Sequence, residues 1–195
     1  MAVIGDVDAV VLAGGRGSRL GAPSKPDFVV AGRRLLDVAL SAVGGARRTV
    51  VVGPGPVPPG VLLTREEPPF GGPVEAVAAG LAALPDHAPW TLLLACDLPG
   101  AEAGVARLLA SDPGPDVDGV CLRDQDDRLQ WLLGCYRTDA LLGRLADRGD
   151  PPLTAMYRLL QPLRLVGLDA APELTHDVDT PHDAEDWVRR LGGHR

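Results

Sequence analysis

The sequence contains little cysteine, no long apolar run and no excess of positive charge. Its three cysteines, Cys96, Cys121 and Cys135, stand in apolar surroundings without the spacing of a metal site. A sparse, odd-numbered set is typical of reduced and buried thiols, and we expect a cytoplasmic protein. Cys96 stands beside Asp97, but no nearby histidine offers the basic partner that a nucleophilic cysteine needs.

Two further absences exclude classes of partner. No apolar stretch is long enough to cross a bilayer, and no basic segment followed by an apolar one opens the chain, so we expect neither a membrane span nor a leader. The formal net charge of -7 and the sequence pI of about 5.0 argue against general binding to nucleic acid or to anionic membranes. An anionic ligand therefore needs a local group of cations.

Apolar segments of strand and helix type alternate along the chain. With 195 residues, 46% of them hydrophobic, the chain can bury a full core, and we expect one domain over 1–195. Apolar runs bounded by Gly and Pro predict strands at 9–13, 49–52, 61–64, 90–95, 119–122, 131–136 and 163–166. Helical spacing predicts helices at 35–43, 73–84, 105–111, 139–146, 152–160 and 183–191. This alternation predicts an α/β fold, a Rossmann-like three-layer sandwich with a mostly parallel sheet.

A glycine-rich segment with three cations follows the first predicted strand. Three of the four residues from 14 to 17 are glycine, which permits a sharp turn whose N–H groups converge on an anion. Arg16, Arg19 and Lys25 add positive charge within the same segment. The segment matches neither G-x-x-x-x-G-K-[ST] nor G-x-G-x-x-G. We interpret it as a phosphate-binding loop; the alternative is an ordinary turn with solvated arginines.

Carboxylates occur in two further loops. Asp97 follows the apolar run 90–95, and Asp177 and Asp179 stand two residues apart, so their side chains point the same way in an extended segment. Oxygen ligands of this kind suit magnesium, which is often held by one or two carboxylates and substrate phosphates. In the alternatives, Asp97 caps a turn and Asp179 caps the last helix. Because ligands bind beyond the carboxyl ends of parallel strands, we expect the glycine segment, the loop 65–73 and Asp97 to meet there.

A cationic loop facing a carboxylate-bound magnesium ion is what nucleotidyl transfer requires. Negative charge builds on the α-phosphate oxygens and on the leaving pyrophosphate, and positive groups already in place stabilise both. Beyond this, the protein has to align the acceptor phosphate with the α-phosphorus. No Ser-His-Asp or Cys-His set is apparent in the sequence.

The sequence resembles the molybdenum cofactor guanylyltransferases (MobA-like NTP transferases) from about Asp8 to Trp187. The matching motifs, in chain order, are Leu12-Ala13-Gly14-Gly15 with Arg19, Gly21 and Lys25-Pro26, then Gly72-Pro73, Cys96-Asp97-Leu98-Pro99 and Asp177-Val178-Asp179-Thr180-Pro181. The resemblance implies the nucleotide-diphospho-sugar transferase type of fold and transfer of GMP from GTP to the phosphate of molybdopterin, with Mg²⁺ as cofactor and release of pyrophosphate. It also allows transient contact with molybdoenzyme chaperones.

The resemblance also implies a role for each matching residue. Catalytic roles fall to Arg19, Lys25 and Asp97, metal binding to Asp97 and Asp179, and acceptor binding to Asp177 and Asp179. The nucleotide would be bound by Leu12, Ala13, Gly14, Gly15, Lys25, Glu67, Gly72 and Asp97. Related cytidylyltransferases usually carry Ala-Gly where this sequence has Gly14-Gly15, so the glycine pair favours GTP over CTP. Gly72-Pro73 points the same way.

The sequence departs from the family pattern at three places. Ser24 replaces the usual aspartate before the lysine, Glu75 stands where a small residue is common, and two aspartates, 177 and 179, replace asparagines used near the pterin. Relatives with the same scaffold use other acceptors. The alternatives are therefore cytidylyl transfer to molybdopterin, transfer to phospholactate or a sugar phosphate, or a non-catalytic paralogue that binds nucleotide or cofactor.

Overall fold

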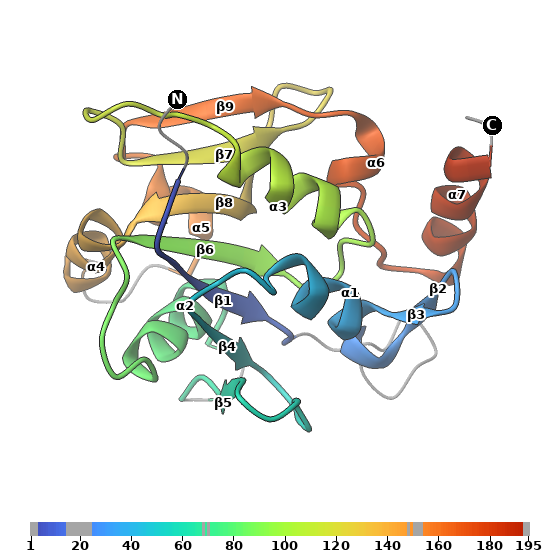
Figure 1. The fold of residues 1–195 in the computed structure, drawn as a ribbon, viewed down its shortest axis with the longest axis horizontal. Coiled ribbons are helices and arrows are strands. Elements are labelled where there is room, and N and C mark those ends of the chain that lie inside the picture. Colours follow the sequence, from blue (N-terminus) through green and yellow to red (C-terminus); the bar gives the residue numbers. More distant parts are fainter. Residues whose placement is uncertain are drawn as a thin grey trace.

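A seven-stranded sheet forms the centre of the protein (Figure 1). The structure is a computed structural model that describes residues 4–14, 25–67, 69, 71–147, 149 and 154–192. The strand order is β5-β4-β1-β6-β8-β7-β9. The strands are β1 Val7–Leu12, β4 Arg48–Val52, β5 Leu62–Thr64, β6 Trp90–Ala95, β7 Gly119–Arg123, β8 Leu129–Arg137 and β9 Leu165–Asp169.

The sheet is parallel except at β8. Strands β5, β4, β1 and β6 pair in parallel, as do β7 and β9, whereas β8 runs antiparallel to both β6 and β7. β7 and β8 form a hairpin, and in its turn the Asp124 N–H donates to the Arg128 carbonyl at 3.0 Å. All six residues of β1 are buried, as expected for a strand with neighbours on both edges and helices on both faces. The predicted mostly parallel sheet is confirmed.

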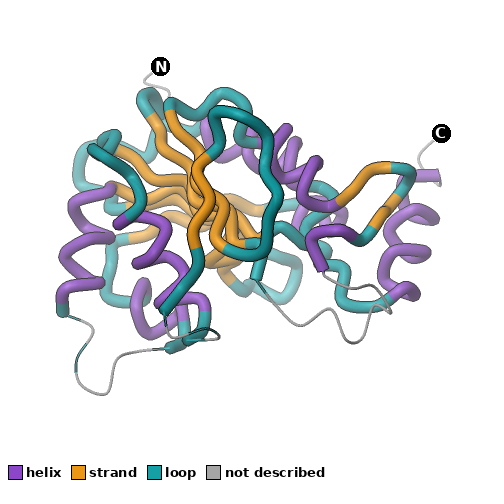
Figure 2. The backbone as a smooth tube through the Cα atoms, turned by 90° about the horizontal axis from the view of Figure 1, so that it is seen from below, coloured by secondary structure: helices purple, strands orange, loops and turns teal. Residues whose placement is uncertain are grey.

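Helices cover both faces of the sheet, which gives three layers (Figures 1 and 2). One face packs against α1 and α3, and the other against α2, α4 and α5. Beside the sheet, α7 packs on a two-stranded hairpin of β2 and β3 through Val30, Val178 and Trp187 (Figure 2). The helices are α1 Leu35–Ala42, α2 Pro73–Ala82, α3 Ala101–Leu109, α4 Thr138–Ala146, α5 Met156–Leu160, α6 Pro172–Thr175 and α7 Pro181–Gly192, and the hairpin strands are Val29–Val30 and Arg33–Arg34.

Several predicted boundaries differ from the observed ones by two or more residues, and α6 was not predicted. α3 begins at Ala101 rather than at 105 and therefore has Gly104 in its interior. Glycine is unfavourable in a helix interior by propensity, but at this position it lets the side chains of Leu122 and Leu133 approach the helix closely. α5 begins at Met156, four residues after the predicted start. β9 begins two residues late, because the Leu163 N–H donates to the Leu160 carbonyl in the turn after α5. In the described part of the chain, no helix is both long and apolar enough to cross a membrane.

Candidate active site

The carboxyl ends of β1, β4, β5 and β6 lie at one edge of the sheet, because these four strands are parallel neighbours. Backbone hydrogen bonds extend beyond the strands: the Cys96 N–H donates to the Leu12 carbonyl at 3.0 Å, and the Ala13 N–H to the Val52 carbonyl at 2.8 Å. The loops that follow β1, β5 and β6 border a cavity of about 310 Å³. The predicted meeting of three loops at this edge therefore holds for the residues described. The cavity is lined by Leu12, Gly14, Glu66, Gly72, Pro73, Ala76, Ala95, Cys96, Asp97 and Leu132.

The start of α2 forms one wall of this cavity. Gly72 precedes the helix with φ of 96°, a conformation that L side chains rarely adopt, and Pro73 is the first helical residue. The first N–H groups of a helix have no partner within the helix, so this wall presents donors suited to an anion. Leu12, Ala76 and Leu132 add apolar surface. A flat apolar group with an attached anion fits such a lining.

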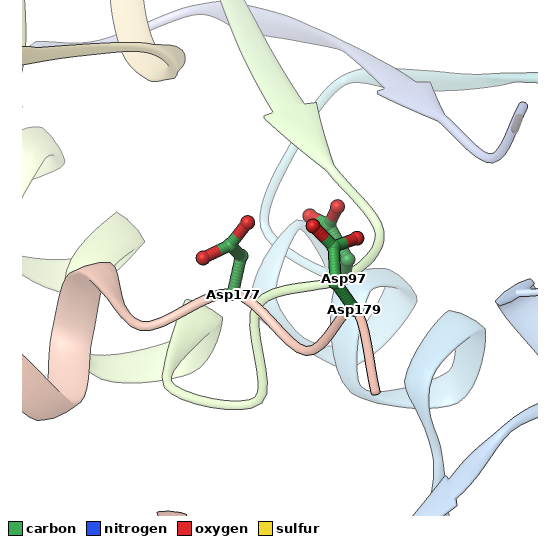
Figure 3. Close-up of side chains that lie close together, drawn as sticks. All are labelled: Asp97, Asp177 and Asp179. Atoms are coloured by element: carbon green, nitrogen blue, oxygen red, sulfur yellow. The ribbon is translucent and has the colours of Figure 1, made fainter. Parts of the chain in front are cut away.

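Three carboxylates gather beside the cavity (Figure 3). Asp97 lies in the turn after β6, while Asp177 and Asp179 lie on the segment between α6 and α7, with ligand oxygens of all three within 4.8 Å of one another. The Val178 N–H donates to the Asp97 carbonyl at 3.0 Å and so ties the two segments together. Crowding by surrounding protein atoms, together with the negative charge of Asp97, raises the pKa of Asp177. The cluster thus concentrates negative charge.

Asp179 is available to this cluster because other residues cap α7. The Thr180 hydroxyl accepts from the Asp183 N–H at 3.2 Å, and the Asp183 carboxylate accepts from the Thr180 N–H at 2.7 Å. This reciprocal pair is a capping box. The alternative that Asp179 caps the last helix is therefore wrong.

Lys25 is the cation of the cluster. Its ammonium donates to Asp97 Oδ2 at 2.6 Å and to Asp179 Oδ1, and its side chain is only 13% exposed. Burial lowers the pKa of Lys25, but the two carboxylates outweigh this effect and raise it to about 12. Lys25 is therefore charged at neutral pH. It comes from the 3-10 turn Lys25–Asp27, far from both partners in sequence.

The carboxylates fit a hard divalent cation. Three carboxylate groups within 4.8 Å offer oxygen ligands only, and magnesium and manganese prefer such ligands.

Cys96 lines the cavity but is buried, and burial together with the charge of Asp97 raises its pKa well above the usual range. Burial and a raised pKa are typical of a structural thiol rather than of a nucleophilic one.

The structure describes seven of the eight residues predicted to bind the nucleotide, and one of these, Lys25, pairs with the carboxylate cluster. Leu12, Gly14, Gly72 and Asp97 line the cavity, whereas Ala13 is buried beside it. Glu67 is exposed and outside the lining. Gly15 and Arg19 lie outside the described residues.

Sequence reasoning missed several residues of the cavity wall. The loop after β5 contributes the carboxylate of Glu66 to the lining, one position before the predicted Glu67. Glu66 is half-buried and Glu67 is exposed, so a shift of one residue in this loop decides which carboxylate faces the cavity. Leu132 was missed because it comes from β8, and the insertion of an antiparallel strand beside β6 has no local sequence signal.

Solved structures with the same fold span almost the entire chain. Rv0371c from Mycobacterium tuberculosis H37Rv is 24% identical, with 95% of this chain and 97% of that chain covered and a TM-score of 0.67. Molybdopterin-guanine dinucleotide biosynthesis protein A from Archaeoglobus fulgidus is 16% identical, with 95% and 99% covered and a TM-score of 0.71. 2-C-methyl-D-erythritol 4-phosphate cytidylyltransferase from Thermus thermophilus is 19% identical, with 98% and 100% covered and a TM-score of 0.65.

A structure of Rv0371C in complex with manganese is also similar, with a TM-score of 0.65 at 19% identity over 94% of this chain and 98% of that chain. At identities this low, the structural likeness establishes the fold alone. No curated protein sequence matches the chain. The family model of the MobA-like NTP transferase domain matches residues 9–166, most of the sequence. The chain therefore belongs to the MobA-like NTP transferase family of nucleotidyltransferases.

Proposed function

We propose that this protein transfers GMP from GTP to the phosphate of molybdopterin and releases pyrophosphate. The observation that carries the proposal is the meeting of Asp97, Asp179 and Lys25 beside a cavity with apolar walls and a helix N-terminus. Family membership supports nucleotidyl transfer, and the similar molybdopterin-guanine dinucleotide biosynthesis protein A supports the choice of reaction.

The reaction needs charge stabilisation and alignment more than proton transfer. An acceptor phosphate oxygen attacks the α-phosphorus, and the bond to the β-phosphate oxygen breaks as pyrophosphate leaves. Asp97 and Asp179 would hold Mg²⁺, which supplies positive charge to the phosphate oxygens when bound. Lys25 and Arg19 would bind the triphosphate and its growing negative charge. The similar structure of Rv0371C with manganese supports a divalent cation in this fold.

The cavity is the proposed nucleobase and ribose site. Leu12, Ala13, Gly14 and Gly15 would border the base and the ribose, with Gly72 at the start of α2 opposite. Glu66 would select the base. A carboxylate can accept hydrogen bonds from both N1–H and the N2 amino group of guanine, whereas cytosine offers one amino group at its pairing edge. In this proposal Glu66 takes the place that the sequence assigned to Glu67.

Asp177 and Asp179 are the proposed acceptor side of the site. Both replace asparagines that the family uses near the pterin, so the acceptor is the part of the proposed reaction that these two replacements bear on. The similarity to a cytidylyltransferase that carries methylerythritol phosphate in its name supports a second candidate, transfer to another phosphate acceptor.

The test is pyrophosphate release by the purified protein with Mg²⁺, each of the four NTPs and a panel of acceptors that includes molybdopterin, phospholactate and sugar phosphates. We expect release with GTP and molybdopterin. Glu66→Gln should reduce the preference for GTP over CTP about tenfold, because one charge-assisted hydrogen bond to the base is lost, whereas Glu67→Gln, the neighbouring control, should leave it unchanged. Release with CTP and a different acceptor would establish the second candidate. Tight GTP binding without turnover on any acceptor would establish a non-catalytic paralogue.

A further inference from the structure

The ammonium of Lys25 lies where a metal ion would need ligands. It is bonded to Asp97 at 2.6 Å and to Asp179, two of the three carboxylates of the cluster. The same two residues are the proposed metal ligands. A divalent cation on these carboxylates would bring two positive charges within a few ångströms of each other, and their repulsion opposes simultaneous binding of the metal and the ammonium at this place.

Lys25 can leave the cluster without unfolding the chain. Its charge is carried on a flexible four-carbon stem, and the two carboxylates that hold it belong to loops rather than to the sheet. The surroundings remain negative after it leaves, since Asp177 lies beside the other two carboxylates. An incoming divalent cation would neutralise this charge.

We propose that Lys25 is the resident counterion of the metal site: a divalent cation displaces its ammonium from Asp97 and Asp179, and the released ammonium then binds the phosphates of the nucleotide. This inference rests on the proposed function, because it takes the metal and the triphosphate from there. The ammonium of Lys25 would have two kinds of partner in turn: the carboxylates of Asp97 and Asp179 before the metal binds, and the phosphates of the nucleotide afterwards.

Displacement makes the two ligands cooperative. Metal binding alone is weakened, because the ion pairs of Lys25 must break. With a triphosphate present, the displaced ammonium gains an anionic partner, and metal binding is strengthened. Coupling of this kind is reciprocal, so the metal must strengthen nucleotide binding by the same factor. The device favours a site that fills with metal and nucleotide together.

Lys25 is a direct probe of this displacement, because it is the only lysine in the sequence. The other basic residues among the 19 Lys and Arg are all arginines. Protein labelled with ¹³C and ¹⁵N in lysine therefore gives a single lysine side-chain signal by NMR. We expect this signal to show a held ammonium without metal and to move toward the values of a free lysine on addition of Mg²⁺ alone. A signal that stays unchanged while Mg²⁺ saturates the protein, measured in parallel by calorimetry, would overturn the inference.

A variant gives an independent test. Lys25→Met should bind Mn²⁺ without nucleotide about tenfold more tightly than the wild type, which lies within the usual range of coupling between sites. Arg164→Met is the matched control, since it removes a cation from Asp118, an aspartate outside the cluster, and should leave Mn²⁺ affinity unchanged. Equal or weaker Mn²⁺ binding by Lys25→Met would contradict the displacement.

The same titrations separate this inference from the proposed function. If Mn²⁺ binds neither to the wild type nor to Lys25→Met, with or without GTP, the proposed metal site is wrong and both proposals fail. If Mn²⁺ binds equally to both and the lysine signal does not move, the displacement is wrong, while magnesium-dependent transfer remains as proposed.

Discussion

Two aspartates on opposite ends of the sheet show how differently the two ends are built. Asp8, near the start of β1, is fully buried and accepts hydrogen bonds from Arg47 at 3.0 and 2.8 Å and from the Ala88 N–H at 2.7 Å. Asp97, beyond the end of the neighbouring β6, is 21% exposed and binds the ammonium of Lys25. Asp8 is held by a rigid guanidinium and a backbone group, whereas Asp97 is held by a flexible side chain.

The difference indicates what each end does. A buried carboxylate with three hydrogen bonds fixes structure, because any change leaves a buried polar group without partners. A half-buried carboxylate paired with a lysine and close to two further carboxylates can exchange its partner for a ligand. The contacts at the amino end of the sheet are those of a structural element, and the contacts at the carboxyl end are those expected of the proposed binding site.

The largest expected effect is on activity at the carboxyl end. Asp97→Asn should lower nucleotidyl transfer at least about 100-fold, because it removes a proposed metal ligand and with it charge stabilisation in the transition state. The melting temperature should change little, because Asp97 is partly exposed and outside the packed sheet. Initial rates and thermal unfolding of the same preparation measure both. Full activity in Asp97→Asn would remove Asp97 from the site.

The matching change at the amino end should reverse this pattern. Asp8→Asn should lower the free energy of unfolding by about 2 kcal/mol, since charge-assisted hydrogen bonds to a buried carboxylate are weakened or lost. Transfer rates per folded molecule should stay at the wild-type level. Urea unfolding and an activity assay at low temperature check the two parts. A loss of activity without a loss of stability would break the comparison between the two ends.

A third change tests whether the position of the Asp97 carboxylate depends on the contact between the turn after β6 and α6. An added Cβ at Gly100 would lie 3.0 Å from Leu174 Cα and also contact the Glu173 carbonyl, so the turn after β6 would be pushed away from α6. Gly100→Ala should therefore weaken Mn²⁺ binding and transfer about tenfold, because small displacements of reacting groups are costly.

The control for this change is Gly143→Ala, since nothing lies within 4 Å of a Cβ added on the exposed side of α4. It should preserve Mn²⁺ affinity and raise stability slightly, because alanine favours a helix interior. Wild-type metal affinity in Gly100→Ala would show that the contact with α6 does not position Asp97.

The smallest expected effect is a pH dependence at the amino end. Burial raises the pKa of Asp8, but the hydrogen bonds from Arg47 and Ala88 outweigh it and hold the pKa below its usual range. A lowered folded-state pKa stabilises the protein above the unfolded value of about 3.9, and this contribution is lost as the pH falls through the folded value. The difference in unfolding free energy between wild type and Asp8→Asn should therefore be constant above about pH 5 and shrink below about pH 4. A difference that grows on acidification would contradict the lowered pKa.

The sequence predicted the carboxyl edge more accurately than the details of its contacts. The apolar runs 9–13 and 90–95 placed Gly14 and Asp97 at the same edge, because strands that alternate with helices predict a parallel sheet whose strands all end at one edge. Lys25 is separated in the sequence by 72 residues from Asp97 and by 154 residues from Asp179. No local sequence pattern predicts an ion pair between residues so far apart in the chain. The choice between Glu66 and Glu67 depended on the direction of one loop residue, which tertiary packing decides.

The central claim is that Asp97 and Asp179 hold a divalent cation beside a bound nucleotide. Anomalous diffraction from crystals grown with Mn²⁺ and a non-hydrolysable GTP analogue tests it most directly. We predict one manganese peak coordinated by the carboxylates of Asp97 and Asp179, with the guanine in the cavity beside Leu12 and Glu66. Manganese and nucleotide bound at any other place on the molecule would contradict it.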